Sequence, residues 1–121
     1  VAVGCAVKLN PTTGAIDTSF TTGQEFLLGN IHSMFIHGTS LYVSGYIFSH
    51  RGVTIPQFVK TNTSGDLDTT FNLNSTIIGD VTNMMVTTSG DLIVAGPIKS
   101  ASGKAAAGLV FLSPTTGIRK R

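Results

Sequence analysis

The sequence predicts an all-β fold of small antiparallel sheets that are arranged as repeated units. Two observations lead to this prediction. Closely similar segments recur about fifty-one residues apart, and the apolar runs are short, rich in β-branched or aromatic residues, and bounded by Gly, Ser, Asn or Pro. Only residues 105–112 approach a helical composition, but their counterparts in the other copies are strand-like, so we expect a strand there too.

The clearest repeat is a seven-residue segment. GAIDTSF at residues 14–20 returns as GDLDTTF at residues 65–71. The preceding residues match as well, since AVKLNPTTG (6–14) corresponds to FVKTNTSG (58–65), and LVFLSPTTG (109–117) supplies a third copy. A fixed period of this kind indicates one supersecondary unit that is used several times.

A second module lies between the copies of the first. SLYVSGYI at residues 40–47 corresponds to DLIVAGPI at residues 91–98, and each is preceded by an apolar run. Gly45 and Gly96 match each other, and we expect close approach of another backbone there, because glycine has no Cβ. Alternation on the same strands directs one set of apolar side chains toward a neighbouring unit: Leu41, Val43, Leu92 and Val94.

Each complete unit contains four strand-length runs, which we place at residues 31–37, 40–48, 56–62 and 66–71. Four antiparallel strands in 40–50 residues are typical of a β-propeller blade. The chain therefore divides into a partial blade at 1–20 (strands three and four), a complete blade at 21–71, and a blade at 72–121 that lacks its regular last strand. About two blades and a part do not close a propeller, so we expect a larger propeller or a multi-subunit assembly.

Composition narrows the functional classes. Charged residues make up 12% of the chain, whereas Ser and Thr supply 28 of the 121 positions. Three of the eight cations lie at residues 119–121, so the basic residues form no broad surface of the kind that binds nucleic acid. No apolar run has the length of a membrane span. Cys5 is the only cysteine, which excludes an intrachain disulfide.

The repeat resembles the delta-60 repeat, a β-propeller-forming repeat of secreted bacterial and bacteriophage proteins. The residues that carry the resemblance are NPTTGAIDTSF (10–20), TNTSGDLDTTF (61–71), TSGDLIVAG (88–96) and GTSLYVSG (38–45). The last copy departs from the pattern, with GIRK in place of Gly-x-Leu-Asp. The resemblance implies a scaffold in a virion, at a cell surface or outside the cell, and it implies no defined active site.

The repeated acids are interpreted as structural. Asp17 and Asp68 hold equivalent places in successive blades, too far apart for a catalytic pair, and a short carboxylate there suits bonding to backbone N–H groups. The structural residues of the repeat are thus Gly14, Asp17, Phe20, Gly65, Asp68 and Phe71. Calcium remains the alternative at residues 65–68, where GDLD provides two of the several carboxylates that a calcium loop needs.

The remaining candidates are basic. His32 and His37 are five residues apart and point to opposite faces of a strand, which does not suit a shared metal. His50 and Arg51 fall in a loop at 49–54 that we expect to be exposed. The corresponding loop carries Lys99 and Lys104, so all four residues are candidates for partner contacts at one rim, with a plain solvated loop as the alternative.

These observations predict a non-enzymatic structural or interaction protein, such as a phage tail, fibre or decoration component or a secreted surface protein, that contacts other structural chains and needs no cofactor. No nucleophile, base and acid appear in a catalytic order. The alternative is a carbohydrate-binding propeller that recognises a surface glycan. Such sites stack sugars on Trp or Tyr, but the chain has no Trp, and Tyr42 and Tyr46 have no counterpart in the next unit.

Overall fold

The structure is a computed structural model of the whole chain, and it describes residues 6–20, 30–46, 49–50, 53–54, 58–74 and 77–120. The described residues are mostly β-strand, in small antiparallel sheets, with a single short helix. The all-β prediction is confirmed at this level. No closed sheet forms among the described residues.

The first sheet has the strand order β1-β2-β5. Strand β1 (Asn30–His37) and strand β2 (Ser40–Tyr46) form a hairpin, and β5 (Phe58–Asn62) adds to the other side of β2. These bounds confirm the predicted strand at 31–37 and the described parts of those at 40–48 and 56–62. A two-stranded ladder of β3 (Ser49–His50) and β4 (Val53–Thr54) stands where the sequence predicted a loop.

The second sheet, β11-β8-β7, repeats the first. It consists of β7 (Asn83–Val86), β8 (Leu92–Ala95) and β11 (Leu109–Leu112), so residues 109–112 are a strand, as expected. In each sheet a valine of the central strand lies opposite a methionine on one side and a valine on the other: Val43 with Met34 and Val59, and Val94 with Met84 and Val110. The two sheets therefore have the same register.

A third, smaller sheet has the order β10-β9-β6 and comprises β6 (Ile77–Gly79), β9 (Ile98–Ala101) and β10 (Lys104–Ala105). Close backbone approach at the two matched glycines is confirmed. A Cβ on Gly45 would collide with the carbonyl oxygen of Asn30, and a Cβ on Gly96 would collide with that of Asp80. Both glycines have φ near +150° (152° and 149°), a region that other residues rarely adopt.

The predicted fourth strand is wrong. Residues 66–71 contribute a single bridge, Leu67 opposite Thr61, after which the chain turns into helix α1 (Thr69–Asn74). The cause lies in Asp68, whose carboxylate accepts a hydrogen bond from the N–H of Phe71 at 3.0 Å, as an N-cap residue does. Residues 16–20 likewise form one bridge, Ile16 opposite Leu9, and then turn away. The sheets β1-β2-β5 and β11-β8-β7 thus have three strands each, and a turn with one bridge follows the last of them.

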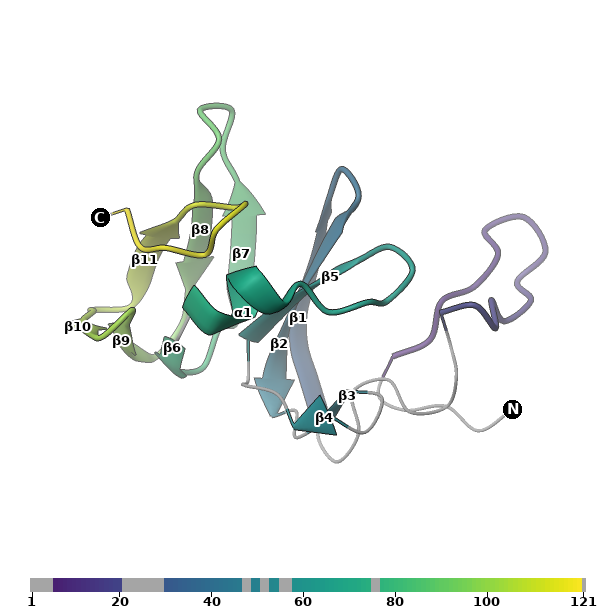
Figure 1. Cartoon of the computed structure of the whole chain (residues 1–121), viewed down its shortest axis with the longest axis horizontal. Coiled ribbons are helices and arrows are strands. Elements are labelled where there is room, and N and C mark those ends of the chain that lie inside the picture. Colours follow the sequence, from purple (N-terminus) through teal and green to yellow (C-terminus); the bar gives the residue numbers. More distant parts are fainter. Residues whose placement is uncertain are drawn as a thin grey trace.

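The layers stack in the order of the sequence (Figure 1). The segment 6–20 lies on one side of the first sheet, and the second sheet lies on the other, with β1 beside β7. Two apolar cores hold the layers together. The first joins the segment to the first sheet: Ala6, Phe20, Leu41, Val43 and Val59. The second joins the two sheets and includes Tyr42, Phe58, Phe71, Met84, Leu92, Val94, Val110 and Leu112.

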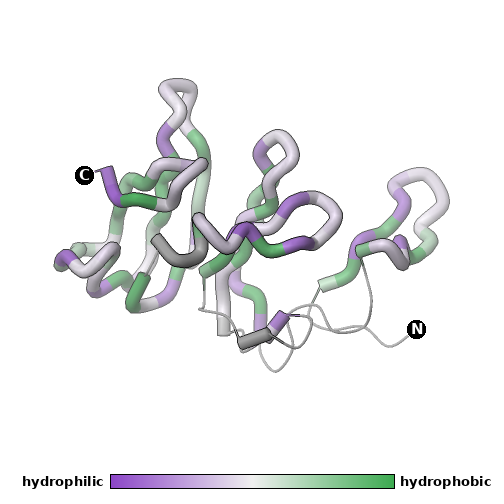
Figure 2. Tube along the Cα trace, viewed as in Figure 1, coloured by the Kyte–Doolittle hydropathy of each residue, from purple (hydrophilic) through white to green (hydrophobic). Residues whose placement is uncertain are grey.

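The alternation of side chains explains why one sheet serves two cores. On β2, Leu41 and Val43 point to the segment 6–20, whereas Tyr42 points to the second sheet. Leu92 and Val94 occupy the places of Leu41 and Val43 and pack against the first sheet, which confirms that these positions face a neighbouring repeat. Figure 2 shows the hydrophobic residues mainly along the strands, whereas the tips of the turns have intermediate hydropathy.

Candidate functional site: the joint between repeats

The same turn occurs three times. In the first copy the N–H of Asn10 donates to the carbonyl of Ala15, that of Gly14 to Asn10, and that of Asp17 to Lys8. In the second copy, equivalent bonds join Asn62 with Asp66, Gly65 with Asn62 and Asp68 with Lys60. In the third copy, they join Ser113 with Ile118, Gly117 with Ser113 and Lys120 with Phe111. The turn is therefore retained in the third copy, although its sequence there departs most from the repeat.

The first residue of each turn also acts through its side chain. The Asn10 side-chain oxygen accepts N–H bonds from Thr12 and Thr13 at 2.8 and 3.0 Å, and the Ser113 hydroxyl accepts one from Thr116 at 3.2 Å. The Asn62 side-chain oxygen does the same for the second copy. Short side chains that bond their own turn favour this geometry over a continued strand.

The structure places the repeated acids inside the same turns. The carboxylate of Asp17 accepts bonds from the hydroxyl and the N–H of Ser19 at 2.6 and 3.0 Å, and these bonds lower the pKa of Asp17 below its ordinary value. The carboxylate of Asp68 caps α1. The glycines Gly14 and Gly65 both have positive φ, and Phe20 and Phe71 are buried in the two cores. These residues hold the turns, and the structure does not bring the two acids together.

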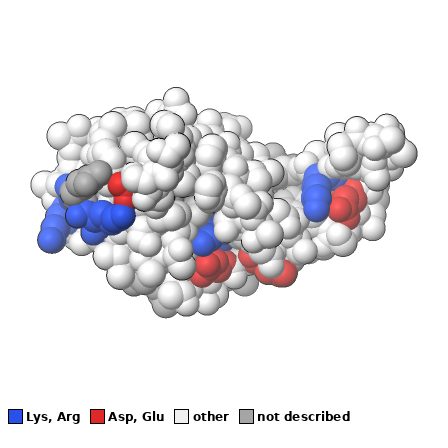
Figure 3. Space-filling view, turned by 90° about the horizontal axis from the view of Figure 1, so that it is seen from above, with Lys and Arg blue, Asp and Glu red and all other residues white. Residues whose placement is uncertain are grey.

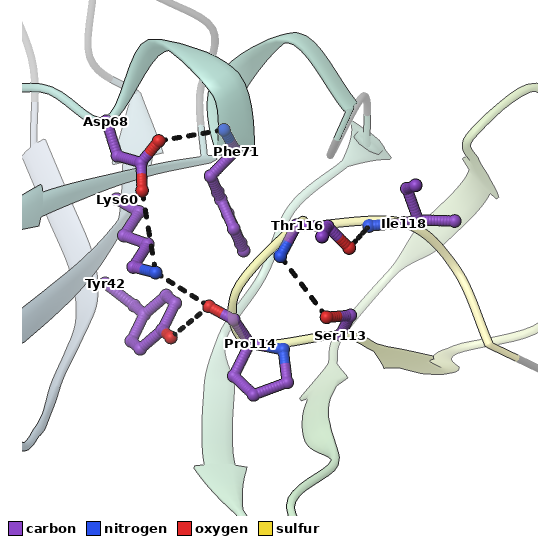
Figure 4. A network of polar contacts seen from close by, with 8 residues as sticks. All are labelled: Tyr42, Lys60, Asp68, Phe71, Ser113, Pro114, Thr116 and Ile118. Carbon is purple, nitrogen blue, oxygen red and sulfur yellow. Dashed lines mark hydrogen bonds and ion pairs between the residues drawn. The ribbon is translucent and has the colours of Figure 1, made fainter.

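Lys60 lies at the centre of the joint between the two sheets (Figure 4). It comes from β5 and is 8% exposed, so its ammonium group has left most of its water. The Lys60 Nζ donates to the carbonyl of Pro114 at 2.8 Å and lies 3.6 Å from the carboxylate of Asp68. It also lies 5.6 Å from the centre of the Tyr42 ring and 5.3 Å from that of Phe71, within range of cation–π attraction.

The acceptor at this joint is a backbone carbonyl of the next turn. Pro114 follows Ser113, the first residue of the third turn, and its carbonyl also accepts the hydroxyl of Tyr42 at 2.7 Å. Burial raises the pKa of Tyr42 to about 12, and the nearby charge of Asp68 adds to this shift. The hydroxyl therefore stays protonated, and it remains a donor, throughout the neutral range.

The same contact occurs one repeat earlier. Lys8 matches Lys60, and its Nζ donates to the carbonyl of Thr63 at 3.1 Å while lying 3.5 Å from Asp17. Thr63 follows Asn62 as Pro114 follows Ser113. We call this contact the lysine latch: a lysine of one repeat bonds the carbonyl after the first turn residue of the next repeat. In the third copy Phe111 stands in the place of the lysine.

Polar contacts also close the other end of the joint. The hydroxyl of Ser44 donates to the carbonyl of Val81 at 2.5 Å, and the Nδ1 of His32 lies 2.7 Å from the carboxylate of Asp80. His32 is thus paired across the two repeats. The ring of His37 stacks on Phe35 at a centroid distance of 6.5 Å. The two histidines serve separate contacts.

The expectation that His50 is exposed is wrong. His50 is 1% exposed, and its Nε2 donates to the carbonyl of Gly65 at 2.6 Å. The imidazole therefore lies against the turn of the second copy. Arg51 lies outside the described residues. Lys99 and Lys104 are exposed, as a rim contact requires, whereas His50 is not available at the surface.

Basic side chains instead gather at the C-terminal end (Figure 3). Arg119 donates to the carbonyls of Lys104 and Ala105 at 3.1 and 2.9 Å, which brings the third turn to β10. Lys120 pairs with Asp91, whose side chain is largely buried. Elsewhere in the described chain lysine lies beside aspartate in the pairs Lys8–Asp17 and Lys60–Asp68.

Tyr42, one of the two tyrosines considered for a sugar site, is not accessible. Tyr42 is 1% exposed, because its ring packs edge-on against Phe71 at a centroid distance of 5.5 Å. The side chain of Tyr46 lies outside the described residues. Within the described part of the chain, no three His, Cys, Asp or Glu residues lie close enough to hold a metal ion, and no helix is long and apolar enough to cross a membrane.

Comparison with protein-family models, with curated proteins and with solved structures returned no match. Function is therefore inferred from the geometry of the joint. Sequence reasoning missed Lys60, Tyr42 and Pro114, which build it. A signal was present, since Val-Lys precedes the turn in two of the three copies at positions 7–8 and 59–60, but a repeated lysine resembles an ordinary solvated position.

Proposed function

We propose that the chain is a non-enzymatic structural and interaction protein, in which propeller-type blades form a rigid scaffold within a larger assembly. The observation that carries this proposal is the lysine latch, which recurs with the same donor and acceptor positions at Lys8–Thr63 and Lys60–Pro114. A contact repeated between successive repeats is the means by which repeat proteins stack into extended supports.

The polar residues of the repeat support the same function. Asp17, Asp68 and Lys60 bond the turns or the adjoining repeat, so their chemistry serves the architecture of the chain. Three copies of one turn, with matched strand registers, favour a blade-like unit that is used several times. The resemblance to the delta-60 repeat extends the proposal to a virion component, such as a tail, fibre or decoration protein, or a secreted surface protein.

The proposal is tested by determining in which fraction of the source the native protein occurs and the mass of the particle that contains it. Antibodies against the chain are used on density-gradient fractions of particles, secreted material and cytosol from the source. We expect the protein in a large particle or in secreted material, at a constant ratio to a second structural chain. Recovery only from cytosol as a free monomer would contradict the proposal.

A further inference from the structure

The two ends of the stack present exposed apolar faces. At the C-terminal end, Met85 is 52% and Leu109 51% exposed; the half-buried Ile93 lies opposite Met85 on the central strand, and Leu109 lies opposite Ala95 on the same face. We call Met85, Ile93 and Leu109 the C-terminal face. The large apolar side chains that a folded protein leaves together at one surface are candidates for an interface.

The opposite end of the stack has a matching surface. On the segment 6–20, Val7 is 43%, Leu9 48% and Ile16 39% exposed, and Leu9 pairs with Ile16 across the turn. We call these three residues the N-terminal face. Ala6 and Phe20 point the other way, into the core with the first sheet.

The internal joint shows what each face fits. The repeat equivalents of Met85, Ile93 and Leu109 are Phe35, Tyr42 and Phe58, which pack against the second sheet. Two of the residues that receive them are Val110 and Leu112, the equivalents of Val7 and Leu9. The C-terminal face thus corresponds to one side of an interface that this chain already forms, and the N-terminal face corresponds to the other side.

We propose that the C-terminal face of one copy docks on the N-terminal face of a second copy, head to tail, so that the stack continues from chain to chain. This inference rests on the proposed scaffold function and names its partner. Unlike faces meet in such a contact, so each copy keeps one face open, and the assembly grows into a ring or a filament instead of stopping at a pair.

The contact between chains lacks two hydrogen-bond donors of the internal joint. Phe111 stands where Lys60 stands and cannot donate to the Pro11 carbonyl of the incoming copy, which matches Pro114. Ile93 likewise replaces Tyr42 and brings no hydroxyl. We therefore expect an apolar contact without the latch, reversible on dilution over about 1 µM to 1 mM.

The experiment uses sedimentation of the 121-residue chain over a dilution series, with three variants. Leu9→Glu alters the N-terminal face and Leu109→Glu alters the C-terminal face, both at residues that are about half exposed, so folding is retained. Ile78→Glu is the matched control, since Ile78 is 63% exposed on β6, outside both faces. Circular dichroism and the thermal midpoint report the fold of each variant.

We expect the wild-type chain and Ile78→Glu to associate, and we expect each face variant alone to lose at least about tenfold in association constant. A mixture of Leu9→Glu with Leu109→Glu forms a one-to-one dimer and stops there, because only one pair of intact faces remains. That limited dimer is the result specific to head-to-tail docking.

Three results would overturn the inference: a monomer at every concentration, normal association of one face variant, or equal loss of association in Ile78→Glu. None of them affects the proposed scaffold function if the protein is still recovered in an assembly with a different structural chain. If the purified chain self-associates but the native protein is recovered from the source only as a cytosolic monomer, the scaffold function is rejected instead.

Discussion

At the scale of single residues, the joint depends on groups whose chemistry only the fold reveals. Lys60 is a cation with two aromatic rings, one carboxylate and one carbonyl around it, although lysine is rarely buried. The sequence placed His50 in an exposed loop, yet His50 and Tyr42 are both buried, and each donates to a turn carbonyl. Sequence spacing cannot reveal these contacts, since both acceptors are backbone groups from another turn.

Tyr42 should make the protein sensitive to alkali. Its pKa is raised to about 12, compared with about 10 in an unfolded chain. The folded state therefore holds the phenolic proton more tightly, so this contribution to stability is complete below pH 10 and is lost as the pH rises to about 12. The free energy of unfolding should fall across that window.

The measurement is denaturant unfolding between about pH 9 and pH 12, together with the tyrosinate absorbance. Tyr42→Phe is the control, because it keeps the ring and removes the ionising hydroxyl. In that variant the fall in stability should be smaller and the component that titrates near pH 12 should vanish. If Tyr42→Phe and the wild type respond alike, the hydroxyl does not make this contact.

At the scale of elements, the strands were predictable and the fourth segment was not. The strands combine β-branched residues with apolar alternation, and the matched glycines mark where backbones approach, so 31–37 and 109–112 were assigned correctly. Thr69, Thr70 and Phe71 have strand propensity, yet they begin a helix, because Asp68 satisfies the N–H of Phe71. A local cap outweighs a weak intrinsic preference over three residues.

The two lysine latches differ in burial, and this difference predicts different effects of substitution. Lys60→Met removes a buried cation and with it the ion pair to Asp68, so we expect the free energy of unfolding to fall by roughly 1–3 kcal/mol. Lys8→Met is the matched control at the equivalent position, where the lysine side chain is 44% exposed, and we expect a loss below about 1 kcal/mol. Chemical unfolding of both variants at neutral pH measures the difference. Equal losses would mean that burial does not strengthen the latch.

At the scale of the whole molecule, the repeat order was predictable and the layer arrangement followed from it. A fifty-one-residue period with alternating apolar faces requires neighbouring units to cover each other, and the two cores lie between successive layers. The sequence did not reveal how much of each layer remains uncovered. Leu9 and Leu109 look like ordinary core positions in a repeat, yet each is about half exposed.

The shared core predicts that the two sheets open together. Phe71 is 0% exposed and belongs to the core that the two sheets share, so Phe71→Leu should lower the free energy of unfolding by roughly 1–2 kcal/mol. Amide hydrogen exchange should then speed up in β2 and β8 alike. Phe20→Leu changes the equivalent residue of the first core and should speed up exchange mainly in the segment 6–20. Equal acceleration of β8 in both variants would show that the two cores are not separable.

The latch has a consequence for how such a chain changes over evolutionary time. Its acceptor is a main-chain oxygen, carried by Thr63 in one repeat and Pro114 in the next, and every amino acid brings that oxygen. The residue that receives the lysine is thus free to mutate without loss of the contact, provided that the backbone of the turn is kept. Copies can diverge far in sequence and still contact each other with the same geometry. Homology among such chains would then be recognisable from these backbone hydrogen bonds after sequence similarity has been lost.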